Sequence, residues 1–268
     1  MGVYMDKEYR NRRESRNNEP QAEADGIVEG RNPVMEALKA GRKIDKLFIL
    51  EGARGESIQE IVRRAKQAGA VIVETDRKRL DAMSITRAHQ GVIAFIPVRE
   101  YSTIEEVLEE ANEKGKAPLL VVCDHIEDPN NLGAIIRTAE ASGADAVVIP
   151  KRRSAGLTAT VSKASAGALE HMKVIKVSNI ANFLREIKKY GIWVFGMTME
   201  GSKLIYEADF KLPSAVVVGS EGKGISNTVL DECDFLISIP MKGAVSSLNA
   251  SAAAAVVLYE AVRQRMEV

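Results

Sequence analysis

Beyond residue 118 the chain alternates between short apolar runs and longer segments with helical spacing. Apolar runs lie at residues 119–123, 146–150, 174–177, 192–195, 215–219 and 235–239. Residues 132–142 carry a helical pattern that Gly143 stops, and residues 246–265 form an alanine-rich one. Strands that are apolar on both faces, with helices between them, are typical of a parallel sheet covered on both sides. The pattern therefore predicts an α/β domain with a parallel sheet over residues 119–268.

Residues 26–98 show a shorter version of the same alternation. Strands are expected at residues 46–50, 71–73 and 92–96, and helices at residues 33–40 and 57–68. Pro33 favours a first helical turn, and glycines follow both helical segments. We expect a separate small α/β domain here. Its 13 basic and 9 acidic residues make it mildly basic, which is compatible with RNA.

Two segments lie outside these domains. Residues 1–25 are polar and mixed in charge, so they predict a disordered tail. Residues 99–118 interleave glutamates with apolar residues and end in Gly115 and Pro118, which predicts an acidic helix linking the domains. The first residues lack the apolar core of a signal peptide, and no apolar run approaches the roughly 20 residues that span a bilayer. We expect a cytoplasmic protein without a membrane partner.

The composition excludes little else. The chain has 37 basic and 37 acidic residues, so its net charge indicates no partner. The two cysteines, Cys123 and Cys233, each border an apolar run and have no metal-ligand spacing. We expect two reduced, buried thiols and no metal site.

Polar residues and glycines follow three of the predicted strands. Ligands of open parallel sheets bind beyond the C-terminal ends of the strands, so these loops are the candidate site. The first loop begins at Asp124 and leads into Asn131 and Arg137. The second contains Gly219 and Glu221. The third follows residue 239 and leads into the last helix.

Each loop also has a purely structural explanation. Asp128 or Asn131 can cap a helix, and so can Ser246 or Ser247. Asn249 would lie inside a helix, where asparagine is unfavourable, and therefore favours a site role. The glycine-rich turn is neither GxGxxG nor a P-loop, which argues against a nucleotide-binding oxidoreductase.

Together, the three loops resemble the motifs of a known family. DPNNLGAIIRTA, VVGSEGKGIS and IPMKGAVSSLNASAAAAVVLYEA are similar to motifs 1, 2 and 3 of the SpoU/TrmH family of SPOUT-type RNA methyltransferases. The resemblance covers residues 119–268 and implies a trefoil-knotted domain, S-adenosylmethionine as cofactor and no metal. It also implies a homodimer in which two subunits build each active site.

The first domain adds a narrower resemblance. VEGRNPVMEALKAG and HQGVIAF are similar to the ribosomal-protein-like substrate-binding domain of the RlmB-like subgroup. That subgroup implies methylation of a guanosine 2′-hydroxyl in 23S ribosomal RNA. Transfer RNA is the alternative substrate, and a non-catalytic RNA-binding protein of ribosome assembly is the alternative function.

The resemblance implies roles for individual residues. Five positions match the family's catalytic residues: Asn131, Arg137, Glu221, Ser247 and Asn249. Five match its cofactor-lining positions: Thr198, Gly219, Ile239, Met241 and Leu248.

The proton acceptor stays open at this point. The resemblance implies that Arg137 is the base. A guanidinium is essentially always charged, however, so the alternative is that Arg137 grips phosphate and stabilises developing negative charge. His125, in motif 1, is a competing base. Candidate RNA contacts are Arg31, His89 and Gln90 in the first domain, and Lys151 and Arg152 after the strand at residues 146–150. A solvated basic loop explains the last two equally well.

Overall fold

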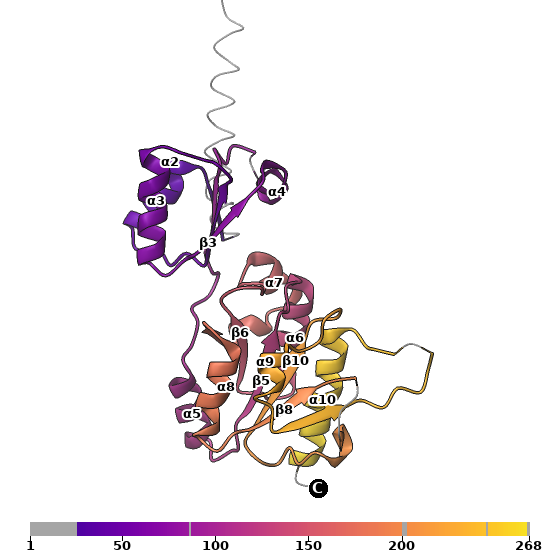
Figure 1. Ribbon diagram of the computed structural model, residues 1–268. Coiled ribbons are helices and arrows are strands. Elements are labelled where there is room, and N and C mark those ends of the chain that lie inside the picture. Colours follow the sequence, from indigo (N-terminus) through magenta and orange to yellow (C-terminus); the bar gives the residue numbers. More distant parts are fainter. Residues whose placement is uncertain (1–25, 86, 200–202, 245, 267–268) are drawn as a thin grey trace, which may run out of the picture. The chain divides into compact units, whose positions relative to one another are not determined.

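The computed structural model describes residues 26–85, 87–199, 203–244 and 246–266. The chain divides into two compact units (Figure 1). The first comprises the described residues up to Arg99 together with Leu157–Ala159, and the second comprises Glu100–Gly156 and the chain from Thr160. The tail predicted at residues 1–25 lies outside the described residues. Within the described ranges, no helix is long and apolar enough to cross a membrane.

The first unit is built on a four-stranded mixed sheet in the order β1-β4-β2-β3. Strands β2 and β3 are parallel, whereas β4 runs antiparallel to both β1 and β2. The elements are β1 (Ile27–Glu29), α2 (Arg31–Lys39), β2 (Lys46–Leu50), α3 (Glu56–Gln67), β3 (Val71–Thr75), α4 (Arg77–Met83) and β4 (Val92–Phe95).

Helices cover both faces of this sheet. One apolar cluster joins α2 and α3 to the sheet, and a second gathers Leu80 of α4 with Phe48 and Ile93. The sequence does not predict β1 or α4. Strand β1 has three residues, and α4 buries Leu80 without the repeated apolar stripe that marks a helix. Helix α2 begins at Arg31 rather than Pro33, since proline is tolerated anywhere in the first turn.

The second unit contains a seven-stranded sheet in the order β7-β6-β5-β10-β8-β11-β9, and every pairing in it is parallel. This confirms the parallel α/β fold predicted from the apolar runs. The strands are β5 (Leu119–Asp124), β6 (Ala146–Pro150), β7 (Lys173–Val177), β8 (Trp193–Met197), β9 (Lys203–Leu204), β10 (Ser214–Gly219) and β11 (Phe235–Ser238). The helices are α5 (Ile104–Glu113), α6 (Pro129–Ala141), α7 (Ala159–Ala164), η1 (Ala168–Glu170), α8 (Ile180–Lys188), η2 (Ile205–Glu207), α9 (Asn227–Leu230) and α10 (Ala250–Arg265).

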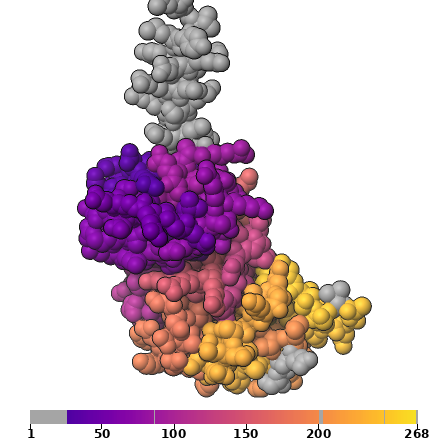
Figure 2. Space-filling view, turned by 45° about the horizontal axis from the view of Figure 1, so that its top comes forward, coloured from indigo at the N-terminus to yellow at the C-terminus, as the bar shows by residue number. Residues whose placement is uncertain are grey.

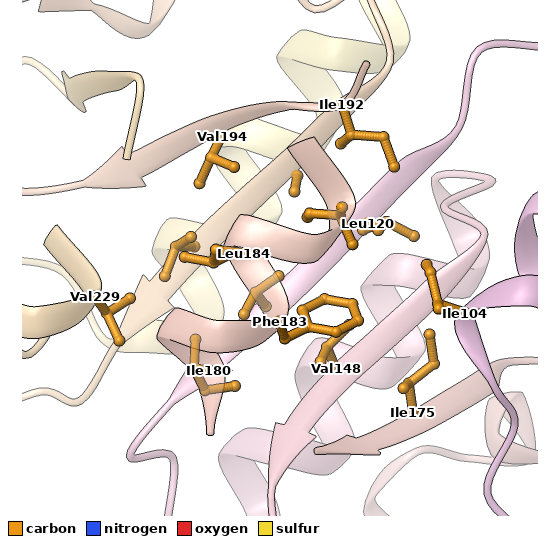
Figure 3. Packing of buried hydrophobic residues seen from close by; sticks show 14 of the residues in the cluster. Ile104, Leu120, Val148, Ile175, Ile180, Phe183, Leu184, Ile192, Val194 and Val229 are labelled. Carbon is orange, nitrogen blue, oxygen red and sulfur yellow. The ribbon is translucent and has the colours of Figure 1, made fainter. Parts of the chain in front are cut away.

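Apolar cores lie on both faces of the parallel sheet. On one face, Phe183 and Leu184 of α8 lie among Val148 and Leu120 of the strands (Figure 3). On the other, α6 and α10 pack together and against β6 and β10. All six residues of β5 are buried, as expected for a central strand covered on both sides. Helix α5, expected to link the domains, also contributes Ile104 to the core of the second unit.

Hydrogen bonds attach the last turn of α10 to the segments that precede β5 and β10. The guanidinium of Arg265 donates to the carbonyl oxygens of Phe210 at 2.7 Å, Ala117 at 2.6 Å and Leu212 at 2.9 Å. Burial lowers the pKa of this guanidinium. The preceding loop, Met241 to Asn249, is exposed at every described position and projects from the unit (Figure 2).

Candidate active site

The candidate site lies at the C-terminal edge of the parallel sheet. Strands β5, β10, β8 and β11 are neighbours, so their C-terminal ends share one edge. Gly219, the last residue of β10, is in register with Asp124, the last of β5. Motifs that are distant in the sequence therefore meet at this edge.

The glycine-rich loop after β10 folds back on itself. Ser220 and Gly224 exchange two backbone hydrogen bonds, of 3.1 and 2.8 Å. A Cβ atom on Gly219 would lie 2.2 Å from the carbonyl carbon of Gly224. Gly219 is thus required by the close approach of the loop's own backbone.

A cavity of about 320 Å³ opens beside this loop, and we call it the first cavity. Its lining includes all five predicted cofactor residues, namely Thr198, Gly219, Ile239, Met241 and Leu248. Met197, Val218 and Leu230 supply apolar wall. The hydroxyl oxygen of Thr198 is buried and has no hydrogen-bond partner among the described residues. A ligand with both apolar and hydrogen-bonding parts fits such a lining.

Three of the predicted catalytic residues form one polar network. The Nδ2 of Asn131 donates to Oε1 of Glu221 at 3.0 Å, and the Nδ2 of Asn249 donates to Oδ1 of Asn131 at 3.0 Å. Asn249 also donates to the same oxygen of Glu221. The network joins residues from the starts of α6 and α10 with the glycine-rich loop.

Helix capping explains how the two asparagines are placed. Asp128 caps α6 by accepting from the backbone N–H of Asn130, which leaves the Asn131 side chain available to the network. Asn249 caps α10: its Oδ1 accepts from the backbone of Ser251 at 2.9 Å and of Ala252 at 3.2 Å. The expectations that Ser246 or Ser247 caps this helix, and that Asn249 lies inside it, were therefore wrong.

The other two predicted catalytic residues lie apart from the network. Ser247 is exposed and lines the first cavity. Arg137 is exposed on α6 and borders neither this cavity nor the one described next. One copy of the chain therefore does not bring Arg137 together with the other four residues.

A second cavity, of about 760 Å³, lies on the other side of the glycine-rich loop. Residues from Ser220 to Gly224 border both cavities, and so does Ala250. Asn131 and Glu221 of the network also line the second cavity. The glycine-rich loop therefore separates the two cavities, and its Glu221 belongs to the polar network.

Two cations line this cavity, one from the basic run after β6 and one from the glycine-rich loop. Arg153 and Lys223 line the second cavity, whereas Lys151 and Arg152 do not. Arg153 has a left-handed backbone, with φ of 55°, which turns the chain after β6. The basic run at residues 151–153 and the lysine within GSEGKG were the available signals, but the sequence could not tell which cation faces the cavity.

The thiol nearest the site is chemically inert. Burial, reinforced by the charge of Asp124, raises the pKa of the Cys123 thiol to about 12. Burial likewise raises the pKa of Cys233 to about 12. Both thiols stay protonated near neutral pH, so the reactive groups at the site are oxygens and nitrogens. Among the described residues, no cluster of His, Cys, Asp or Glu could hold a metal ion.

The predicted RNA contacts of the first unit already form hydrogen bonds within the protein. His89 is 5% exposed, its Nε2 lies 2.9 Å from Oδ1 of Asp81, and its Nδ1 accepts from the backbone of Gly91. Its ring therefore links the loop to α4, and the expected RNA contact stays a prediction. Arg31 donates to the backbone oxygen of Gln90 at 3.3 Å, and both side chains remain at the surface.

Comparisons with known proteins agree with the site. A model of the SpoU rRNA Methylase family matches residues 118–259, and a model described as RNA 2′-O ribose methyltransferase substrate binding matches residues 27–102. The Bacillus subtilis protein YacO, named for the TrmH family of tRNA/rRNA methyltransferases, is 46% identical over 89% of this chain and 95% of its own length.

Solved structures give the same result. The SpoU methyltransferase AviRb of Streptomyces viridochromogenes, in complex with AdoMet, is 26% identical with a TM-score of 0.56, over 89% of this chain and 90% of AviRb. An RNA 2′-O ribose methyltransferase is 27% identical with a TM-score of 0.53, over 91% of both chains. These matches define the class as RNA methyltransferases. The chain belongs to the SpoU rRNA Methylase family, which confirms the resemblance seen in its three motifs.

Proposed function

We propose that this chain transfers a methyl group from S-adenosylmethionine to a ribose 2′-hydroxyl of RNA, and that its substrate is a guanosine of 23S ribosomal RNA. The observation that carries the proposal is the first cavity, where all five residues expected around the cofactor line one space. The complex of AviRb with AdoMet supports this cofactor. The family description and the substrate-binding model over residues 27–102 support ribosomal RNA and the ribose.

The lining of the first cavity fits S-adenosylmethionine. Its volume of about 320 Å³ lies at the lower end of the range of small-molecule sites. The unpartnered hydroxyl of Thr198 offers a hydrogen bond to a polar edge of the ligand, and Val218 and Leu230 offer apolar contact. Backbone groups of the glycine-rich loop are accessible to a ligand at Gly222, where no side chain stands.

The ribose 2′-hydroxyl is a weak nucleophile. The protein residues must align its oxygen with the methyl group and stabilise the negative charge that develops on it. S-adenosylmethionine supplies a methyl group on a positively charged sulfur that leaves as a neutral thioether. Glu221, held by Asn131 and Asn249, stands on the wall between the two cavities and orients the ribose. Fixing the oxygen in line with the methyl carbon lowers the entropic part of the barrier.

Arg137 acts in this proposal from a second copy of the chain. It is exposed and borders neither cavity of its own copy. Helix α10, packed beside α6, exposes Val256 and Tyr259, at 38% and 53%. A homodimer through these helices would cover this apolar surface and bring Arg137 to the partner's site, where it grips phosphate and stabilises the attacking oxygen.

Mixed dimers test this arrangement. Arg137→Ala and Glu221→Gln are each expected to be inactive, and mixing them should restore activity because one site of the mixed dimer is intact. Light scattering should give a dimer at micromolar concentration. A fully active monomer, or no restoration by mixing, would contradict the shared site.

RNA mapping tests the function itself. A strain without this protein should lack one 2′-O-methylguanosine of 23S ribosomal RNA, and the purified protein should restore it to a transcript. A missing ribose methyl in transfer RNA would refute the ribosomal substrate and keep the reaction. An unchanged methylation map, with no calorimetric binding of S-adenosylmethionine, would favour a non-catalytic RNA-binding protein.

A further inference from the structure

One pair of polar side chains at the site has no part in the mechanism above. Asp124 ends the central strand β5, and His125 follows it. The Asp124 side chain is buried, with 3% of it exposed, whereas 29% of the His125 side chain is exposed and the residue lines the second cavity. A buried carboxylate beside a half-exposed imidazole needs a physical explanation.

Asp124 contacts both the end of the glycine-rich loop and the imidazole of His125. Its Oδ2 accepts from the backbone N–H of Ser226 at 2.7 Å, and its Oδ1 lies 2.8 Å from Nδ1 of His125. A carboxylate oxygen this close to Nδ1 favours the neutral tautomer with its hydrogen on Nδ1, which leaves Nε2 as an acceptor. Asp124 thereby ties the end of the glycine-rich loop and the orientation of His125 to one strand end.

The backbone of His125 is unusual as well. Its φ of 60° lies in the left-handed region, where residues other than glycine are uncommon. Such conformations are found where the surroundings hold a side chain in a required place, and they concentrate at functional sites. Here that turn places Nδ1 of His125 2.8 Å from Oδ1 of Asp124.

The second cavity has the groups a nucleotide requires. The charged residues that line it are Glu127, Asp128, Arg153, Glu221 and Lys223. The two cations suit phosphate, and the carboxylates suit the donors of a base or ribose. Its volume of about 760 Å³ falls within the range of small-molecule sites.

Two carboxylates at this cavity each have one oxygen engaged. Oε1 of Glu221 accepts from both Asn131 and Asn249, and Oδ1 of Asp128 caps α6. Nε2 of His125 has no hydrogen-bond partner within the described part of the chain. An acceptor that is oriented, exposed to the cavity and unengaged is what a proton-removing group needs.

We propose that the second cavity receives the target nucleotide, and that His125 accepts the proton of its 2′-hydroxyl while Asp124 positions the ring. The inference rests on the proposed function. The O–H bond breaks and its proton goes to Nε2. The oxygen electron pair forms the bond to the methyl carbon, and the pair of the methyl–sulfur bond goes to sulfur. The products are a 2′-O-methyl ribose, a neutral thioether and an imidazolium that releases its proton to water.

Single-turnover methylation over a range of pH tests the proposal, with the 23S or transfer RNA transcript that the wild type methylates. The wild-type rate should fall as pH is lowered, since a protonated imidazole cannot accept the proton. His125→Asn should be slower by on the order of 100- to 10,000-fold and should lose that dependence. Its affinity for S-adenosylmethionine should stay unchanged, because His125 does not line the first cavity. Asp124→Asn, whose amide oxygen can still accept from Ser226, should fold and be slower than the wild type.

The matched control is His171→Asn, an exposed histidine of the same unit that borders neither cavity. It should retain the wild-type rate and pH profile.

A binding measurement adds a readout that needs no turnover. With S-adenosylhomocysteine present, the wild type should bind an oligonucleotide with a ribose at the target several-fold more tightly than its 2′-deoxy analogue, and His125→Asn should not distinguish them. A normal rate and pH profile in His125→Asn would overturn the proposal. Failure of the wild type to bind S-adenosylmethionine or to methylate any transcript would instead refute the proposed function, before any variant is compared.

Discussion

The two units use their polar loop residues in different ways. In the second unit, Asn131, Glu221 and Asn249 come from three distant motifs and meet in one network. In the first unit, His89 is enclosed by its own loop, and Arg31 bonds to Gln90. Parallel strands bring all their C-terminal ends to one edge, whereas the antiparallel β4 separates the strand ends of the first unit. Polar residues after strands therefore predict a site reliably in a parallel sheet and less so in a mixed one.

Among the comparisons between the two units, the largest expected effect concerns Arg137, which stays outside the network of the second unit. Arg137→Ala should lower turnover by roughly 100- to 1000-fold, or about 3–4 kcal/mol, because a donor to the developing negative charge is lost. Arg137→Lys should also be severely impaired, since it keeps the charge but not the planar fork. Calorimetry should show unchanged binding of S-adenosylmethionine in both variants. Near-normal single-turnover methylation by Arg137→Ala would remove this residue from the site.

A substitution in the glycine-rich loop tests how closely the site depends on backbone packing. Gly219→Ala should cost roughly 3 kcal/mol of unfolding free energy and abolish cofactor binding, because the new Cβ overlaps the backbone of Gly224. Gly222→Ala is the matched control, since a Cβ there meets nothing within 4 Å. Trp193, the chain's single tryptophan, lies in β8 and reports unfolding of the second unit by fluorescence. Equal stability of the two variants would contradict the close approach.

A pair of variants in the first unit should separate structure from RNA contact. His89→Ala should destabilise that unit by about 2 kcal/mol, because Asp81 and the buried N–H of Gly91 lose their partner. Hydrogen exchange in β2 and β4 should show the loss, and Trp193 fluorescence should not. Arg31→Ala should leave stability within about 0.5 kcal/mol and weaken RNA binding. The reverse result would make His89 the contact after all.

The smallest effect separates the two roles of Asn249. Asn249→Ala should lower the unfolding free energy by about 1 kcal/mol through loss of the cap of α10, and also reduce methylation. Asn249→Ser should restore stability, because serine caps a helix, but not activity, because it cannot donate to both Asn131 and Glu221. If serine restores methylation, capping alone explains this residue.

Most strands of the second unit could be predicted from the sequence, because each is marked by its own apolar run. Strand β6 lies where the apolar run indicated, and β5 and β10 differ by one residue. The errors fall at helix starts: α6 begins at Pro129 and α10 at Ala250, since capping by Asp128 and Asn249 depends on backbone geometry that periodicity does not carry. The trefoil knot and the homodimer implied by the resemblance stay predictions.

The site was predicted unevenly for the same reason. The cofactor residues gather in one cavity, because they follow strands that share an edge. The sequence could not show that Arg137 borders no cavity of its own copy, or that Arg153 rather than Arg152 faces the second one, because both depend on where a side chain points.

The fastening of α10 has a consequence for how the protein is made. Arg265 bonds to Ala117, 148 residues earlier, and so closes the second unit at the very start of β5. A chain emerging from a ribosome can complete the first unit early, but it gains this bond only after almost every residue has been translated. Asn249 sits at the opposite end of the same helix, about 24 Å away at the ordinary helical rise. The nascent chain therefore cannot form its polar network until Asn249 has been made, and before that point a folded first unit is present without a complete active site.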